Sequence, residues 1–298
     1  MKNKQLKVLG RPRLLIIGCG DVGMRLIPLL QARFRVFALT SQPERLSELR
    51  SAGAIPLLGN LDVPHSLHRL KGLADFIVHL APPPTQGTQD QRTRNLVAIL
   101  PRHGRLVYVS TTGVYGDCKG AFFDETRPVA PINARAQRRV DAESVLRRWA
   151  RTHAGRLSIL RVPGIYAADR LPLERLRQGT PALIDAEDVY TNHIHADDLA
   201  QIIALTLFRA QPLRVYHTVD DSSLKMGEYF DQVAAAFKLP LPPRVPRNEL
   251  SNQVSPMLLS FMSESRRLSN DRLKMELGIR LRWPTVSDLL ASLGSPPT

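Results

Sequence analysis

The stretch Leu14-Leu15-Ile16-Ile17-Gly18-Cys19-Gly20-Asp21-Val22-Gly23 decides the fold of this chain. Four consecutive apolar residues predict a buried strand, and residues 23–31 have the apolar spacing of a helix. The glycines between them follow the order G-x-G-x-x-G, which in a strand–turn–helix context is typical of a dinucleotide-binding turn. Gly18 permits the tight turn, Gly20 lets the backbone approach a pyrophosphate, and Gly23 lets the helix pack closely. A plain glycine turn without a nucleotide is the weaker alternative, because a second strand follows at the expected place.

The phosphates of a dinucleotide would sit on the free N–H groups where this helix begins. The residues expected to hold the nucleotide at this turn are Gly18, Cys19, Gly20, Asp21, Val22 and Gly23.

The end of the second predicted strand bears on the choice between NAD and NADP. Sites that prefer NAD usually place an acidic residue here for the ribose 2′-hydroxyl, and none occurs at 40–43. Thr40, Ser41 and Arg45 offer hydroxyls and a cation instead, which suit a 2′-phosphate. We therefore expect NADP to be favoured over NAD, although Arg45 could equally be an exposed residue in the first turn of a helix.

Short apolar runs alternate with helical patterns through the first half of the chain. The predicted strands are 14–17, 35–39, 76–80, 106–109, 158–162 and 215–219, and the predicted helices between the early ones are 23–31, 43–52 and 91–100. This alternation predicts an α/β fold with a Rossmann-type, doubly wound parallel sheet. The later sequence has fewer strands and more proline, which predicts a smaller, interleaved C-terminal lobe for the substrate. The expected organisation is a basic leader at 1–13, a nucleotide-binding domain at 14–163 with 193–219 returning to it, and the smaller lobe at 164–192 and 220–298.

Composition narrows the class of protein. Two cysteines in 298 residues make no disulfide framework, which suggests a reducing, cytoplasmic setting. No apolar run is long enough to cross a bilayer, so no membrane partner is expected. The formal net charge is +14, which is compatible with nucleic-acid binding or with a solvated, arginine-rich surface. The second interpretation is favoured, because the basic residues are spread along the chain without a nucleic-acid motif, and nucleic acid is not expected as a partner.

Beyond the glycine turn, the chain resembles the extended short-chain dehydrogenase/reductase group, also called the NAD-dependent epimerase/dehydratase family, nearly from end to end. The most specific match is Val107-Tyr108-Val109-Ser110-Thr111-Thr112-Gly113-Val114-Tyr115-Gly116, which resembles the strand and turn that carry the family's catalytic Ser or Thr. Further matching blocks are 59–62, 79–81, 160–166, 192–200 and 269–278. The resemblance implies additional cofactor contacts from Asn60, Leu61, Leu80, Ala81, Pro82, Arg139 and Val162.

Two departures separate this sequence from the family pattern. The loop is G-x-G-x-x-G where the extended group usually shows G-x-x-G-x-x-G. More importantly, with Glu143 anchoring the alignment, the Tyr and Lys positions of the family's Y-x-x-x-K motif fall on Arg135 and Arg139. These departures indicate an atypical branch, of which the small bacterial YeeZ-like subgroup is one candidate.

The missing tyrosine changes the expected chemistry. Arginine cannot replace it as acid/base because the guanidinium stays protonated at working pH. Arg139 could still serve the ribose hydroxyls as the lysine does, and Thr111 could polarise a carbonyl. Tyr115, Tyr166 and Asp124 are the candidate proton carriers. The catalytic set expected is Thr111, Tyr115, Arg135 and Arg139.

Three functional alternatives stay open at this point. The chain could be an oxidoreductase or epimerase with a relocated acid/base. Its arginines could bind an anionic small-molecule substrate such as a nucleotide sugar or another phosphorylated compound. It could also be a catalytically silent NAD(P)(H)-binding sensor or scaffold. The first two are compatible and are favoured over the third, and a homodimer is one expectation for its assembly.

The run His193-Ile194-His195-Ala196-Asp197-Asp198 resembles a metal-binding pattern, since both histidines would share one face of a strand. We favour a structural role and expect no metal. In this interpretation Asp197 or Asp198 caps an apolar helix at 199–208.

Overall fold

The computed structural model describes residues 10–294, so most of the predicted leader at 1–13 lies outside the described residues. The central sheet has seven strands in the order β12-β7-β5-β4-β1-β2-β3. Their bounds are β1 Arg13–Ile17, β2 Arg35–Thr40, β3 Ile55–Leu58, β4 Phe76–His79, β5 Arg105–Thr111, β7 Arg156–Val162 and β12 Arg214–His217. Neighbouring strands pair in parallel from β5 through β4, β1 and β2 to β3. The predicted Rossmann-type parallel sheet is confirmed.

The chain divides into two compact units. Unit 1 comprises residues 1–109, 141–159 and 203–214, and unit 2 comprises residues 110–140, 160–202 and 215–298. These units are defined by how compactly their residues pack. The two lobes that the sequence suggests, at 14–163 with 193–219 and at 164–192 with 220–298, are defined instead by their expected roles in binding cofactor and substrate, and they stay a prediction.

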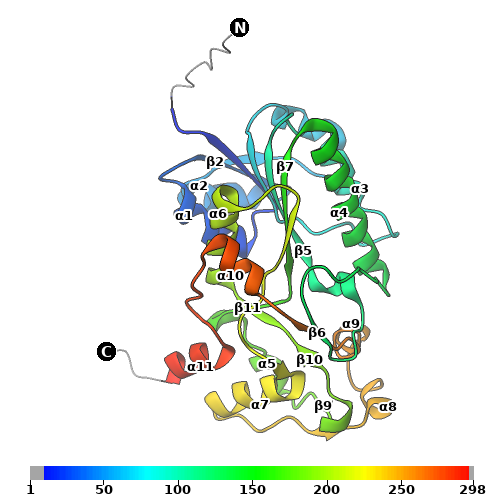
Figure 1. Cartoon of the computed structure of the whole chain (residues 1–298). Coiled ribbons are helices and arrows are strands. Elements are labelled where there is room, and N and C mark those ends of the chain that lie inside the picture. Colours follow the sequence, from blue (N-terminus) through cyan, green and yellow to red (C-terminus); the bar gives the residue numbers. More distant parts are fainter. Residues whose placement is uncertain (1–9, 295–298) are drawn as a thin grey trace. The chain divides into compact units, whose positions relative to one another are not determined.

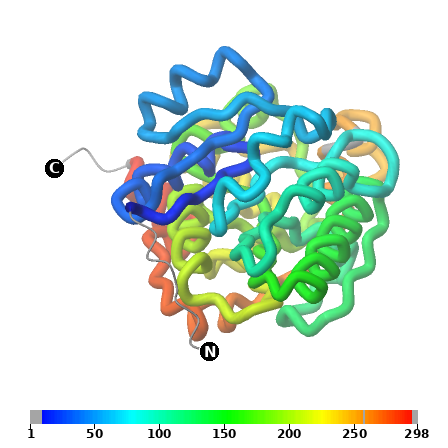
Figure 2. The backbone as a smooth tube through the Cα atoms, turned by 90° about the horizontal axis from the view of Figure 1, so that it is seen from above, coloured from blue at the N-terminus to red at the C-terminus, as the bar shows by residue number. Residues whose placement is uncertain are grey.

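Unit 1 is built around the apolar strand β1. Residues Leu14 to Ile17 are each at most 2% exposed, because β2 and β4 flank them and helices cover both faces. The helices α1 and α2 and the later half of α6 lie on one side of the strands, and α3 with the later half of α4 lies on the other (Figures 1 and 2). The helix bounds are α1 Asp21–Leu30, α2 Leu46–Ser51, α3 Gln91–Val97, α4 Ala134–His153 and α6 Ala196–Arg209, with 3₁₀ turns η1 Pro43–Arg45 and η2 Pro64–Leu70.

The predicted strands of the sheet are confirmed to within about two residues at each end. The sequence missed β3, which reads Ile-Pro-Leu-Leu. Proline removes a backbone donor and argues against a strand, yet an edge strand tolerates it because one side needs no partner. β3 is such an edge strand and pairs only with β2.

Unit 2 contains short strands and helices around its own core. The short strands pair as β11 His193–His195 with β8 Gly164–Tyr166, β14 Arg244–Val245 with β9 Ala182–Leu183, β15 Arg267–Leu268 with β6 Phe122–Phe123, and β10 Tyr190–Thr191 with β13 Leu224–Lys225. The helices are α5 Leu173–Arg177, α7 Met226–Ala236, α8 Arg247–Leu250, α9 Pro256–Phe261, α10 Asp271–Leu277 and α11 Val286–Gly294, with 3₁₀ turns η3 Thr112–Tyr115, η4 Ala168–Arg170 and η5 Asp185–Glu187. The sequence predicted few strands here, because strands of two or three residues show no alternation of apolar and polar side chains.

The core of unit 2 forms where α7 packs against α11. Phe230, Val233 and Leu289 are at most 4% exposed and belong to one apolar cluster. No helix among residues 10–294 is long and apolar enough to span a bilayer.

The helix predicted at 199–208 begins earlier than expected, and the predicted cap is wrong. α6 starts at Ala196, so both aspartates lie inside its first turn. The His195 ring accepts a hydrogen bond from the Asp197 backbone N–H at 3.2 Å. The fully buried Asp198 carboxylate accepts from the backbone N–H groups of Arg282 and Trp283 instead. It therefore ties a distant segment to α6 rather than capping the helix.

Candidate functional site

The space around each glycine of the turn in unit 1 explains why a glycine stands there. Gly18 has φ +78°, and a Cβ built on it would lie 2.5 Å from both Cα and N of Ala81. A Cβ on Gly23 would lie 2.7 Å from the Cys19 sulfur. Gly20 is exposed, and a Cβ there would meet open space. Thus Gly18 and Gly23 serve packing within the fold, whereas Gly20 leaves room for an approaching ligand.

The start of α1 suits the phosphates of a dinucleotide. Gly20 is the N-cap residue of this ten-residue helix and makes no side-chain cap, so an anion meets no N-cap side chain at the first N–H groups. The Asp21 carboxylate is turned along the helix, where it accepts from Arg25 Nε at 3.0 Å. Unsatisfied N–H groups and the helix dipole together favour an anion at this position. The residues present therefore fit a bound pyrophosphate.

Cys19 contributes its backbone to the turn. Its side chain is 2% exposed, and burial raises the pKa of its thiol to about 11. The thiol stays protonated at neutral pH, so it has no nucleophilic role. The Cys19 carbonyl accepts a hydrogen bond of 2.6 Å from an Arg45 guanidinium nitrogen.

This hydrogen bond places Arg45 beside the glycine turn, although the two residues are 26 positions apart. Arg45 also bonds Glu48 at 2.9 Å, and this bond raises the pKa of the guanidinium. Of the hydroxyls in the segment, Thr40 is buried and accepts from the Gln42 backbone N–H, whereas Ser41 is exposed. The positive charge at the end of β2 thus faces the same turn as the phosphates would.

The other unit 1 residues predicted to bind the cofactor meet at the same edge of the sheet. The backbone N–H groups of Leu80 and Ala81 both donate to the Ile17 carbonyl, at 2.8 and 3.0 Å. The Gly59 N–H donates to the Thr40 carbonyl at 3.0 Å. This bond places the following residues, Asn60 and Leu61, next to the end of β2. The Pro82 carbonyl accepts from Arg92 at 3.2 Å. The carboxyl ends of β1, β2, β3 and β4 therefore assemble one rim, which is where open α/β sheets bind ligands.

The remaining predicted residues belong to unit 2 and are described within it. Thr111 ends β5 and is half-buried, and its hydroxyl oxygen accepts from the Gly113 N–H at 3.2 Å. Its hydroxyl proton is still available to donate to a ligand. The sequence missed Glu264, a 6% exposed carboxylate that reaches this turn and is held by Arg266 at 2.7 Å and by Asn133 at 3.2 Å. Residue 264 is far from the turn in sequence, so no local pattern could have revealed it.

Tyr115 is enclosed in a hydrogen-bonded network. It is 1% exposed, and its hydroxyl lies 2.6 Å from His217 Nε2 and 2.6 Å from an Arg161 guanidinium nitrogen. His217 Nδ1 faces the Ser269 carbonyl at 3.1 Å, so Nδ1 carries the proton and Nε2 accepts from the tyrosine. Burial lowers the pKa of His217 to about 3, so this ring is neutral at neutral pH. This network indicates that Tyr115 stabilises the fold. Tyr166 is also 1% exposed and is therefore equally buried.

The two arginines at the Y-x-x-x-K positions lie in the first half of α4. Arg135 is half-buried, with its guanidinium carbon 4.4 Å from the centre of the Phe261 ring. Arg139 is half-buried one turn later. Val162, at the end of β7, is 4% exposed. A guanidinium on an aromatic ring keeps its N–H edges available for an anion.

The fold and the glycine turn define a protein that holds a dinucleotide on a Rossmann-type sheet. A family model described as NAD(P)H-binding matches residues 18–209. The chain belongs to this NAD(P)H-binding family, within the extended short-chain dehydrogenase/reductase group that contains the epimerases and dehydratases.

Two curated proteins are similar in sequence. A dTDP-glucose 4,6-dehydratase from Streptomyces niveus is 26% identical over 156 residues, covering 49% of this chain and 46% of the relative. An N-acetyl-alpha-D-glucosaminyl-diphospho-ditrans,octacis-undecaprenol 4-epimerase from Escherichia coli O157:H7 is 26% identical over 249 residues, covering 77% and 73%. The chain thus spans about half the length of the first relative and about three quarters of the second.

Solved structures agree over nearly the whole chain. A functionally unknown conserved protein from Silicibacter pomeroyi is 32% identical with a TM-score of 0.76, covering 95% of this chain and 98% of the other. A putative NAD-dependent epimerase/dehydratase from Methylobacillus flagellatus is 26% identical with a TM-score of 0.72, covering 96% and 100%.

Proposed function

We propose that unit 1 binds NADP(H) in preference to NAD(H). The observation that carries this proposal is the bond from Arg45 to the Cys19 carbonyl, which places a cation against the phosphate turn. The open space at Gly20 and the uncapped start of α1 would hold the pyrophosphate, with the rim from Asn60 to Pro82 alongside. When bound, a nicotinamide nucleotide supplies hydride-transfer chemistry.

We further propose that the protein is an oxidoreductase or epimerase for a carbonyl compound or an anionic, nucleotide-sugar-like substrate. Both curated relatives are named for hexose derivatives carried on a diphosphate. In this proposal the Thr111 hydroxyl donates to a substrate oxygen, and Arg135 and Arg139 bind the anionic group. Arginine suits this task because its planar fork matches phosphate oxygens.

A second candidate function is a catalytically silent NADP(H)-binding sensor or scaffold. The observation that favours it is the burial of Tyr115 and Tyr166, since a proton carrier must come within hydrogen-bond reach of the substrate. Asp124 is the exposed one among the three candidate carriers, and its hydrogen bonds from Thr126 lower the pKa of its carboxyl. Asp124 would therefore be ionised at neutral pH and could act as a base but not as an acid.

Replacing Arg45 with glutamine is expected to weaken NADPH binding about 10- to 100-fold. A hydrogen bond to a charged group contributes about 1.5–3 kcal/mol to binding. NADH has no 2′-phosphate, so it makes no such bond with Arg45 and loses nothing when Arg45 is replaced. The affinity for NADH should change by less than about threefold, and the control Arg50→Gln, an exposed arginine of α2, should change neither. Fluorescence titration of both dinucleotides measures these affinities. An equal loss for NADPH and NADH would contradict the assignment of Arg45 to the 2′-phosphate.

The two candidate functions are separated by turnover. The NADPH-loaded protein is incubated with a panel of nucleotide sugars and simple carbonyl compounds, and cofactor oxidation and product formation are followed by absorbance and mass spectrometry. Turnover that falls about 100-fold in Thr111→Val supports the enzyme. Tight NADPH binding without turnover of any panel member supports the sensor.

A further inference from the structure

The net positive charge of this protein is confined to one of its two units. Unit 1 contains 22 lysines and arginines against 8 aspartates and glutamates, a formal net charge of +14. Unit 2 contains 19 of each and is formally neutral. The basic residues look scattered along the sequence, because segments of the two units alternate. Arg45 alone would serve the nucleotide, so most of this charge is not explained by the cofactor.

Part of the excess charge lies in a row along the amino-terminal edge of the sheet. Five of its seven strands begin with an arginine. In sheet order these residues, which we call the arginine row, are Arg214 of β12, Arg156 of β7, Arg105 of β5, Arg13 of β1 and Arg35 of β2. Neighbouring strands lie about 4.8 Å apart, so the row extends over about 24 Å. It lies at the opposite ends of the strands from the glycine turn.

Four of the five side chains of the arginine row have no carboxylate partner in the described part of the chain. Within residues 10–294, no Asp or Glu oxygen lies within 4.0 Å of the side-chain nitrogens of Arg13, Arg35, Arg105 or Arg156. Burial and the neighbouring Arg156 charge lower the pKa of Arg105, as expected for like charges held close together. The residues that precede the row, 1–9, include three lysines and no acidic residue. An anionic partner would relieve this repulsion.

Aromatic rings hold several of these guanidinium groups in place. Arg35 lies over the Phe37 ring at 5.5 Å and Arg105 over the Phe76 ring at 5.6 Å. Arg33, next to the row, lies over Phe208 at 5.4 Å. A guanidinium stacked on a ring is oriented while N–H groups stay available to donate. Arg105 and Arg156 each use one nitrogen to donate to a backbone carbonyl, of Leu207 at 3.1 Å and of Ala210 at 3.5 Å, and keep their other N–H groups for an anion. The side chains thus lose less conformational entropy when they bind a phosphate.

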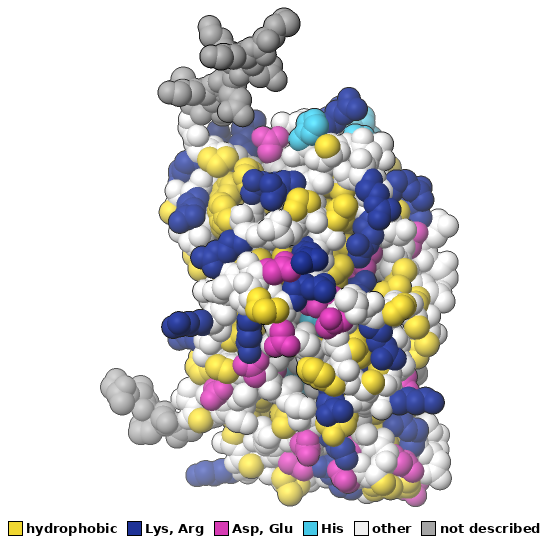
Figure 3. Space-filling view, viewed as in Figure 1, with side chains coloured by type: hydrophobic (Ala, Val, Ile, Leu, Met, Phe, Trp, Pro, Cys, Tyr) yellow, Lys and Arg dark blue, Asp and Glu magenta, His cyan; other side chains and the backbone are white. Residues whose placement is uncertain are grey.

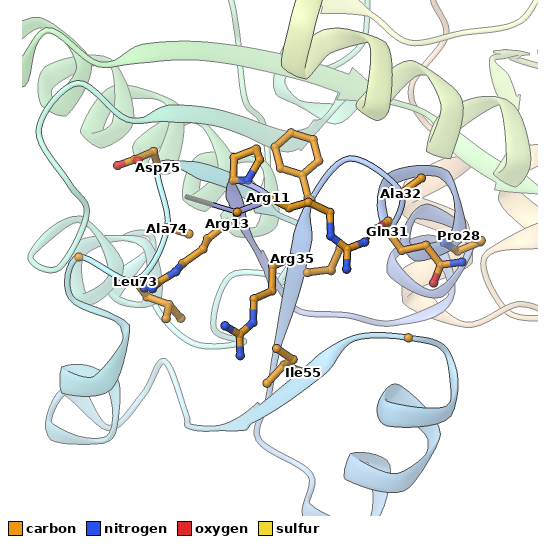
Figure 4. A pocket seen from close by; sticks show the side chains of 16 residues that line it. Arg11, Arg13, Pro28, Gln31, Ala32, Arg35, Ile55, Leu73, Ala74 and Asp75 are labelled. Atoms are coloured by element: carbon orange, nitrogen blue, oxygen red, sulfur yellow. Dashed lines mark hydrogen bonds between the residues drawn. The ribbon is translucent and has the colours of Figure 1, made fainter. Parts of the chain in front are cut away.

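A hollow at the amino-terminal ends of β1, β2 and β3 gives the row a concave part. Its volume is about 1020 Å³, and Arg11, Arg13, Arg35 and one carboxylate, Asp75, are the charged residues among its lining. Figure 4 shows the three guanidinium groups spread across the hollow, Arg13 near Leu73, Arg35 near Ile55 and Arg11 toward Gln31. Groups spread in this way contact an extended anion better than a single phosphate. On the face drawn in Figure 3, basic side chains are spread over the upper part with few acidic ones between them.

We propose that the arginine row binds the phosphate backbone of a nucleic acid without reading its base sequence. Duplex DNA carries a phosphate about every 3.4 Å along each strand, so a row of about 24 Å spans about seven base pairs. Arginine pairs with phosphate oxygens through two parallel N–H bonds, and the regular spacing of phosphates along a nucleic-acid strand suits a row of such side chains. The sequence favoured a solvated surface because it could not show that folding brings these residues to one edge of the sheet, with Arg13 paired to Arg35 and Arg105 one position further in. This proposal does not depend on the identity of the cofactor.

The test is fluorescence anisotropy of the full chain with a labelled duplex of about 20 base pairs and arbitrary sequence, from 50 to 200 mM NaCl. Micromolar binding at low salt is expected, with a log–log salt slope of about −4 for four to five phosphate contacts. In the variant Arg13→Gln/Arg35→Gln/Arg156→Gln the slope should fall in magnitude by about three, to about −1. This variant should bind the duplex at least 100-fold more weakly at 50 mM NaCl. The matched control Arg177→Gln/Arg280→Gln/Arg282→Gln removes the same charge from exposed positions of unit 2 and should bind as the parent does.

Three results would overturn the proposal: no duplex binding at 50 mM NaCl, an equal loss in the row and control variants, or binding to phosphatidylglycerol vesicles without binding to duplex. Thermal unfolding and NADPH titration of each variant report whether it is folded. If the triple variant is unstable, the single variants Arg13→Gln and Arg35→Gln, both at exposed positions, should each lower the slope by about one.

Discussion

Gly18→Ala is expected to destabilise the protein by about 3 kcal/mol and to abolish NADPH binding. The new methyl group would lie 2.5 Å from the backbone of Ala81, so the turn and the end of β4 must separate. Overpacking costs about 1–3 kcal/mol, and the left-handed backbone at Gly18 adds about 1–2 kcal/mol for a residue with a Cβ. Thermal unfolding measures the loss, with a decrease in Tm of about 6–12 °C.

Gly20→Ala is the matched control because its methyl group would meet no protein atom within 4 Å. Its stability should stay within about 1 kcal/mol of the parent, the cost of alanine at a helix N-cap. NADPH binding should still weaken at least tenfold, since the methyl group occupies the space of the pyrophosphate. A Gly20→Ala protein that binds NADPH normally would show that the phosphates lie elsewhere. A fully stable Gly18→Ala protein would show that the turn and Ala81 can move apart without cost.

Tyr115→Phe is expected to lower the free energy of unfolding by about 3 kcal/mol. The change leaves His217 Nε2 and an Arg161 N–H buried without their partner, both of which lie 2.6 Å from the hydroxyl in the parent. Hydrogen bonds to charged groups contribute about 1.5–3 kcal/mol, and a buried group left unsatisfied costs about 1–3 kcal/mol. Urea unfolding of the parent and the variant measures the difference, and NADPH affinity should change little because unit 1 is untouched.

Tyr190→Phe is the matched control. Tyr190 is a half-buried tyrosine of the same unit whose ring stacks under Arg267, a contact that phenylalanine keeps. Its stability should change by less than about 0.5 kcal/mol. If Tyr115 were instead the proton carrier, Tyr115→Phe would fold with the stability of the parent and lose turnover. That result would restore Tyr115 to the catalytic set and contradict its structural role.

The sheet and the rim that fits the cofactor were largely predictable from local sequence. The apolar runs of β1, β2, β4, β5, β7 and β12 are visible directly, because buried parallel strands are continuously apolar. The turn at Gly18 was predictable because its positive φ is imposed by the short path from one strand into one helix, whereas the close approach of Ala81 is a long-range contact that the sequence does not show. The edge strand β3 and the two-residue strands of unit 2 were not, since proline and short length remove the periodic signal.

Residues whose role depends on distant partners could not be assigned in this way. Tyr115 follows the strand that resembles the family's catalytic block, which made it a candidate. Its enclosure depends on His217, 102 residues further along, and on Arg161. The same holds for Asp198, which looked like a helix cap until its carboxylate was placed against residues 282 and 283.

The sequence by itself determined that this chain builds a parallel sheet with a glycine turn suited to a dinucleotide. Strand periodicity, turn geometry and the helix start are short-range properties, and each is written into consecutive residues. The tertiary structure alone decided which polar groups are buried, that Arg45 reaches the glycine turn, and that all the net charge lies in unit 1. Burial and electrostatics depend on distances in space, and only folding brings residues far apart in the chain within those distances.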